Sequence, residues 1–245
     1  GVQPIASPLK NNFFITTQTI AGDLSGTGRL TIGTNQINTG ALASIGGGTC
    51  HTNAAACGFI GGGCKNQTSG DSAVVGGGAV NCAKADHAAV GGGLSNIATG
   101  TCATIAGGSY NAAVGNNGAV LGGCYNYGTG NCAVAVGGRA NSAIAAYDTV
   151  AGGCVNTARG GRSVIAGGAG NRACGDLSTI VGGYSGLASS SHAFIGGGSE
   201  NAVHGLSAVT VGGRLNIASG TTSFIGGGDS NKASADYAIV VGGLS

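Results

Sequence analysis

The stretch Ile225-Gly226-Gly227-Gly228-Asp229-Ser230-Asn231 decides the fold, because it recurs in altered form every fifteen residues. The preceding copy reads Thr210-Val211-Gly212-Gly213-Arg214-Leu215-Asn216, and the one before it Ile195-Gly196-Gly197-Gly198-Ser199-Glu200-Asn201. The step runs from Ile45 to Val240 without an insertion or a deletion. A fixed short period of this kind indicates a repeat architecture.

The composition indicates a folded chain with little charge. Only 7% of the 245 residues are charged and the net charge is +2. Such a chain is too apolar to be disordered, and it lacks the basic field that binds nucleic acid. The 54 glycines do not follow a Gly-X-Y period, which excludes collagen. No apolar run approaches the roughly 20 residues of a membrane helix, so we expect no membrane insertion.

Fifteen residues are too few for a helix, a strand and two turns, but they can hold two short strands and two turns. Alternation supports the first strand, where Ala73 and Val75 would point inward and Val74 and Gly76 outward. We therefore predict an all-β fold: a parallel β-roll, or β-solenoid, with 15-residue coils and two short strands per coil. About fourteen repeats over residues 41–245, stacked at ~4.8 Å, would form a rod of roughly 65 Å.

Residues 1–40 do not follow the repeat, and we expect them to form an extended lead-in and N-terminal cap. Leu30-Thr31-Ile32-Gly33 resembles a degenerate first repeat, with Gly33 in register with Gly48. At the other end, Val240–Ser245 stops within a repeat. Because an uncapped coil would leave strand edges open, we expect further chain or a partner beyond Ser245.

Two further columns predict the corners of each coil. The Gly-Gly pair, as in Gly77-Gly78, predicts a corner that needs a positive φ or a close backbone approach. An asparagine follows three residues after the second glycine, except where His51 and Gly186 replace it. Asparagine side chains bond backbone groups in turns, so this column predicts a stacked ladder.

The outward face of the first strand is mostly apolar and contains no charged residue in any repeat. A soluble monomer does not leave such a strip exposed to water, so we expect an oligomer whose chains meet along it. The residues predicted to form this interface are Phe59, Val74, Val134, Val164, Phe194, Val209, Phe224 and Ile239. The outward face of the second strand carries Lys84, Arg159, Arg172, His204 and Lys232 and is expected to face solvent.

The repeat, small-x-Ile/Val-Gly-Gly-Gly-x-x-Asn-x-Ala-x-Gly, resembles the head repeats of trimeric autotransporter adhesins of the YadA type. It is also similar to repeats in phage and viral fibres. Ala193-Phe194-Ile195-Gly196 and Ala218-Ser219-Gly220 carry the resemblance best, and it covers about residues 40–245. It implies a left-handed, homotrimeric β-roll outside the cell, on a cell surface or a virion, that presents a surface to host cells. Bacterial and viral origins both stay open.

Little in the sequence points to catalysis, metal binding or a cofactor, and we expect none of the three. The four histidines, 51, 87, 192 and 204, are scattered, and Asp148 occupies an inward column, either as a local distortion or as a hydrogen-bonded exception. The nine cysteines allow three interpretations: buried small side chains, interchain disulfides, or a disulfide between Cys50 and Cys64, which lie one coil and one column apart.

Two surface clusters are candidates for a ligand. Tyr110 and Tyr125 share a turn column with Tyr127 beside them, and aromatic faces suit sugar rings. Arg159, Arg162 and Arg172 lie in adjacent coils and suit an anionic glycan.

We therefore expect a structural and adhesive fibre segment. Its partners would be further copies of the same chain, in a homotrimer, and a host surface glycan or protein receptor. The alternative is a filament or spike shaft with no receptor. An ice-binding solenoid needs a regular threonine array, whereas Thr104, Thr149 and Thr179 skip coils. A polysaccharide-degrading β-helix needs clustered carboxylates, whereas the eight acidic residues here are scattered.

Overall fold

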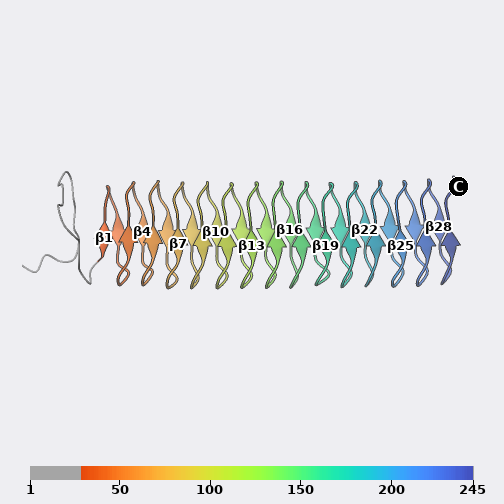
Figure 1. Cartoon of the computed structure of the whole chain (residues 1–245), viewed down its shortest axis with the longest axis horizontal. Coiled ribbons are helices and arrows are strands. Elements are labelled where there is room, and N and C mark those ends of the chain that lie inside the picture. The colour runs from red at the N-terminus through yellow and green to blue at the C-terminus, as the bar shows by residue number, and fades with distance from the viewer. Residues whose placement is uncertain (1–28, 245) are drawn as a thin grey trace, which may run out of the picture.

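The computed structural model describes residues 29–244, and these form a β-solenoid without any helix. Figure 1 shows the coils stacked in one row along the long axis of the molecule. Each coil contributes two strands of two residues, and every pair of neighbouring strands is parallel. The predicted solenoid of 15-residue coils with two strands per coil is therefore confirmed.

The odd-numbered strands form a 15-stranded sheet in sequence order. Its members are β1 (Leu30–Thr31), β3 (Ser44–Ile45), β5 (Phe59–Ile60), β7 (Val74–Val75), β9 (Ala89–Val90), β11 (Thr104–Ile105), β13 (Ala119–Val120), β15 (Val134–Ala135), β17 (Thr149–Val150), β19 (Val164–Ile165), β21 (Thr179–Ile180), β23 (Phe194–Ile195), β25 (Val209–Thr210), β27 (Phe224–Ile225) and β29 (Ile239–Val240).

The even-numbered strands form a 14-stranded sheet on the other side of the core. Its members are β2 (Ile37–Asn38), β4 (Thr52–Asn53), β6 (Gln67–Thr68), β8 (Cys82–Ala83), β10 (Ile97–Ala98), β12 (Ala112–Ala113), β14 (Tyr127–Gly128), β16 (Ser142–Ala143), β18 (Thr157–Ala158), β20 (Arg172–Ala173), β22 (Leu187–Ala188), β24 (Ala202–Val203), β26 (Ile217–Ala218) and β28 (Lys232–Ala233).

A third line of parallel contacts, which the sequence did not predict, runs along one corner. It consists of isolated bridges between residues fifteen apart, from Thr34↔Thr49 to Asp229↔Leu244. Only one residue per coil takes part, so no alternation of polar and apolar side chains marks this line in the sequence.

The degenerate first repeat is part of the solenoid. Leu30 pairs with Ser44, an offset of fourteen residues, whereas Thr34 pairs with Thr49 at the regular offset of fifteen. The segment from Leu30 to Thr34 is therefore one residue shorter than the matching segment of the next coil, from Ser44 to Thr49. Thr34 donates its N–H to the carbonyl oxygen of Gly48, so Gly33 does stand in register with Gly48. Residues 1–28 of the expected lead-in lie outside the described residues.

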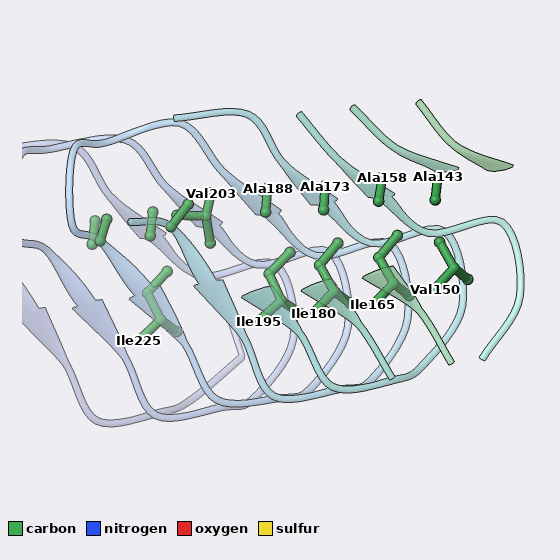
Figure 2. Packing of buried hydrophobic residues seen from close by; sticks show 14 of the residues in the cluster. Ala143, Val150, Ala158, Ile165, Ala173, Ile180, Ala188, Ile195, Val203 and Ile225 are labelled. Carbon is green, nitrogen blue, oxygen red and sulfur yellow. The ribbon is translucent and has the colours of Figure 1, made fainter. Parts of the chain in front are cut away.

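The core is one layer of branched side chains packed against one layer of small ones. Figure 2 shows Ile165, Ile180 and Ile195 in a row that faces Ala158 and Ala173 across the interior. All five are at most 1% exposed. The alternation predicted around Val75 is confirmed, because Ala73 and Val75 are buried while their outward neighbours are exposed. Each buried isoleucine contributes about 1.5–3 kcal/mol, so the sum of many thin layers stabilises the rod.

A ladder of buried asparagines closes one corner, as the sequence predicts. The backbone N–H of Asn81 donates to Oδ1 of Asn66, one coil earlier, over 2.9 Å. Nδ2 of Asn81 donates to the carbonyl oxygens of Gly77 and Gly93, at 2.9 and 2.8 Å. The amide thus joins three successive coils and satisfies carbonyl groups that the turn leaves free. At Gly186 the side-chain ladder is interrupted.

Candidate functional site

The outward face of the odd-numbered strands, here called the apolar face, is defined by two columns without a charged side chain. The leading column is Ser44, Phe59, Val74, Ala89, Thr104, Ala119, Val134, Thr149, Val164, Thr179, Phe194, Val209, Phe224 and Ile239. The flanking column is Gly46, Gly61, Gly76, Gly91, Ala106, Leu121, Val136, Ala151, Ala166, Val181, Gly196, Val211, Gly226 and Val241. All eight residues predicted to form an interface lie on this face, and none of them is fully buried.

Large side chains on the apolar face stand beside small ones. Each phenylalanine of the leading column is followed, two residues later, by a glycine, as in Phe59 and Gly61. The ring lies over that glycine, because a Cβ built on Gly61 would be 3.4 Å from Cε1 of Phe59. The same relation holds for Phe224 and Gly226, at 3.5 Å. The rings of Phe59 and Phe224 therefore lie along the sheet, over the glycines beside them.

The outward face of the even-numbered strands, here called the polar face, carries charged and hydroxyl side chains among exposed apolar ones such as Ile97 and Ile144. Lys84, Arg159, Arg172, His204 and Lys232 are all exposed on it, as expected from the sequence. Hydroxyl groups bond along the stack, as where Ser189 Oγ and His204 Nδ1 lie 2.7 Å apart. The two faces of one thin body thus differ in charge at these coils, which lie around residue 84 and from residue 159 onward.

Tyr110 and Tyr125 form an exposed aromatic stack at the corner that precedes the polar face. Their ring centroids are 4.9 Å apart and the ring planes are within 8° of parallel. Both residues have a positive φ, 56° and 58°, which is uncommon for a bulky side chain. Tyr127, on β14, is also exposed. All three tyrosines are therefore on the surface, and Tyr110 and Tyr125 are in contact.

The predicted arginine cluster is divided. Arg162 lies at a turn and forms an ion pair with Asp176, with Nη2 and Oδ2 2.8 Å apart. Arg159 and Arg172 both lie on the polar face, and Arg159 Nε lies 3.1 Å from Sγ of Cys174. An anionic ligand on that face would meet Arg159 and Arg172, whereas the charge of Arg162 is already matched.

The remaining polar candidates have structural partners. The buried carboxylate of Asp148 accepts hydrogen bonds from the backbone N–H groups of Ala145, Gly161 and Ser163, at 2.7, 3.0 and 2.9 Å, and from the Ser163 hydroxyl group at 2.8 Å. It is thus the hydrogen-bonded exception, one of the two interpretations that the sequence leaves open. Cys50 and Cys64 are both free thiols, and their pairing stays a prediction.

His51 replaces an asparagine of the ladder and is fully buried. Its Nδ1 accepts the backbone N–H of Asn66 at 3.0 Å. Nε2 faces the carbonyl groups of Gly47 and Gly63 without reaching good hydrogen-bond geometry. Burial lowers the pKa of this imidazole below its usual value of 6.5, because the charged form would lose its hydration.

Two features are absent from the described part of the chain, residues 29–244. No group of three or more histidine, cysteine, aspartate or glutamate side chains there is arranged to hold a metal ion. No helix in the same span is long and apolar enough to cross a membrane.

Taken together, the coils and faces define the class of this chain: a two-sheet parallel β-solenoid with a charge-free side and a polar side. A search with models of protein families found no match to the chain, and a comparison with curated proteins found none.

One feature of the corner was missed by reasoning from the sequence. The two glycine columns have the same sequence signal, since both are filled in every repeat. Only the backbone geometry separates them, because Gly108 has a positive φ and no room for a Cβ, whereas Gly107 has neither restriction.

Proposed function

We propose that this chain is a structural and adhesive fibre segment, in which three copies of the solenoid associate along their apolar faces. The observation that carries this proposal is the apolar face itself, which runs through every coil without a charge. Contiguous apolar surface of that extent on a soluble protein marks an interaction site. The number three and a left-handed coil come from the resemblance to trimeric adhesin heads.

The polar face and the tyrosine corner would then point away from the assembly and meet the partner. The stacked rings of Tyr110 and Tyr125 offer apolar surface to a sugar ring, and Arg159 and Arg172 offer charge to an anionic group. Each such contact is weak alone, but three chains on one fibre multiply it through avidity. The role is attachment to a host glycan or protein receptor, outside the cell, without catalysis or a cofactor.

A shaft without a receptor is the second candidate. It is favoured by the regularity of the coils, whose backbone contacts repeat with the same offset from Thr34 to Leu244. Binding of host glycans separates the two candidates. The adhesive function predicts binding that the double variant Tyr110→Ala/Tyr125→Ala weakens at least tenfold. If the assembled protein binds no glycan and no host cell, the shaft is the better description.

The first test is the mass of the protein in solution, by light scattering, with and without a reductant. A trimer has three times the chain mass of 22.9 kDa. The same mass in both conditions supports association through the apolar faces. A trimer that dissociates on reduction would assign the contact to cysteines, and a stable monomer would contradict the proposal.

A further inference from the structure

The two glycines at each corner differ in what the chain itself requires of them. Gly108 has a φ of +89°, and a Cβ there would be 2.2 Å from the carbonyl oxygen of Gly123. Gly107 has no positive φ, and a Cβ there would have no atom within 4 Å. The chain thus needs glycine at position 108 but accepts a side chain at position 107.

The same contrast repeats in every coil and defines two columns. The positive-φ glycine column is Gly48, Gly63, Gly78, Gly93, Gly108, Gly123, Gly138, Gly153, Gly168, Gly183, Gly198, Gly213, Gly228 and Gly243. The open glycine column is Gly47, Gly62, Gly77, Gly92, Gly107, Gly122, Gly137, Gly152, Gly167, Gly182, Gly197, Gly212, Gly227 and Gly242. In the open column a Cβ would meet no atom closer than 3.7 Å.

Glycine in the open column is unfavourable for an isolated chain. Where a side chain fits without strain, alanine restricts the unfolded chain and stabilises the fold, so each glycine forgoes that gain. Simple inheritance from a duplicated repeat does not explain the column either. Two positions further on, the repeats have diverged to Ser109, Cys124 and Arg139. A constraint from outside the chain accounts for the glycines.

The open glycine column borders the apolar face directly, as in Leu121-Gly122. Together they cover every coil over a width of about 10 Å and a length of roughly 65 Å at ~4.8 Å per coil. This area, on the order of 650 Å² per chain, approaches the ~800 Å² per partner of a standard stable interface. A partner that contacts the backbone once in each coil must itself repeat with the ~4.8 Å spacing of the coils. A second copy of this chain has that spacing by construction.

We propose that a second copy of this chain packs on the apolar face in parallel and coil against coil, and that its backbone contacts the open glycine column. The absence of Cβ atoms lets the two backbones approach, while the side chains of the apolar face fill the rest of the contact. This inference rests on the self-association in the proposed function and adds where the chains meet.

The test compares two variants of the full chain, each of which gains four methyl groups. The first carries Gly107→Ala, Gly137→Ala, Gly167→Ala and Gly197→Ala in the open glycine column. The control carries Ser69→Thr, Ser142→Thr, Ser219→Thr and Ser234→Thr, all on the polar face. Sedimentation equilibrium gives the dissociation constant of each. We expect it to rise at least a hundredfold in the first variant, since each group overpacks the contact, and to stay within threefold in the control.

The outcomes separate this inference from the proposed function. If the wild type associates and the alanine variant associates equally well, the backbone contact is wrong and self-association stands. If the wild type is a monomer, both are wrong. Circular dichroism checks that the alanine variant is folded. If it is not, the single variant Gly137→Ala replaces it, with an expected rise of at least threefold and the same contradicting result.

Discussion

The two glycine columns stand side by side in every coil and look identical in the sequence, but they answer to different constraints. In the positive-φ column the constraint is internal, because a side chain would collide with the backbone of the next coil. In the open column the chain imposes none. Non-glycine residues at other turn positions sharpen the contrast: Val155 and Tyr147 have φ values of 57° and 62°. This chain therefore does not place glycine wherever φ is positive, and it does place glycine where φ is not.

The largest effect is expected from the same substitution made at two neighbouring positions, one in each glycine column. Gly108→Ala should destabilise the surrounding coils by about 3–5 kcal/mol, because the strained φ and a collision with the Gly123 carbonyl oxygen add. Gly107→Ala should change the stability of the dissociated chain by less than about 1 kcal/mol, in the stabilising direction. Denaturant unfolding at high dilution measures both. Equal losses at the two positions would remove the distinction between the columns.

A second large effect is expected from the asparagine ladder, which connects the two columns. Nδ2 of Asn141 donates to the carbonyl oxygen of Gly137 in the open column and to that of Gly153 in the positive-φ column, at 2.8 and 2.9 Å. Its Oδ1 also accepts the backbone N–H of Asn156 at 3.0 Å. Asn141→Ala leaves these buried groups unpaired, so we expect a loss of about 2–4 kcal/mol.

Gly186, which interrupts the ladder, provides the control for that prediction. Gly186→Asn restores the missing donors and should stabilise its coils, although its Cβ would lie 3.0 Å from Oδ1 of Asn171 and must shift slightly. Hydrogen exchange of the two corners reports each change locally. Unchanged protection around Asn141→Ala would show that the ladder is not what holds the two columns together.

The period predicted the fold because each column repeats one physical requirement many times. Inward residues such as Ala73 and Val75 alternate with outward ones in each coil. The position of the first strand and the burial of its side chains could therefore be predicted. The asparagine ladder was predicted for the same reason. The third line of bridges was not, because one residue per coil, such as Ser109 or Cys124, has no alternation.

The candidate surfaces were only partly predictable. The apolar face was predicted, because the absence of charge from a column is visible in the sequence. The division of the arginines was not, since the partner of Arg162 is fourteen residues away at Asp176 and depends on how turns stack. The distinction between the glycine columns depends on the φ angle and on the free space around each Cα atom. Neither property can be inferred from the sequence, because both columns contain only glycine.

A smaller effect is expected from pH at His51, whose Nε2 faces one carbonyl group from each glycine column. Burial lowers the pKa of this imidazole in the folded chain, so the unfolded chain binds the proton first. Stability is then fully present above about pH 6.5 and falls as the pH drops below that value, until the folded chain is protonated too. Protonation of Nδ1 also removes the bond from Asn66.

His51→Asn should abolish this loss, since asparagine fills the position in the regular ladder. Hydrogen exchange in the coils around residue 51, followed between pH 7 and pH 5, measures it. The same substitution at His87, which is exposed at a turn, serves as the control and should leave the loss of stability at low pH unchanged. A loss of stability at low pH that persists in His51→Asn would place its origin elsewhere.

The smallest effect concerns a single turn position where glycine would help and is absent. Val155 is β-branched, 53% exposed and held at a φ of 57°, a conformation that disfavours such side chains. Val155→Gly should therefore stabilise its coil by about 0.5–1 kcal/mol, after the entropy that glycine loses on folding is subtracted. Asn117→Gly, at a φ of 55°, should gain less, because asparagine tolerates this region. Denaturant unfolding of both variants measures the difference. A loss at Val155 would mean that packing of its side chain against neighbouring coils outweighs the backbone strain, and that such turn positions, like the open glycine column, are selected by contacts rather than by φ.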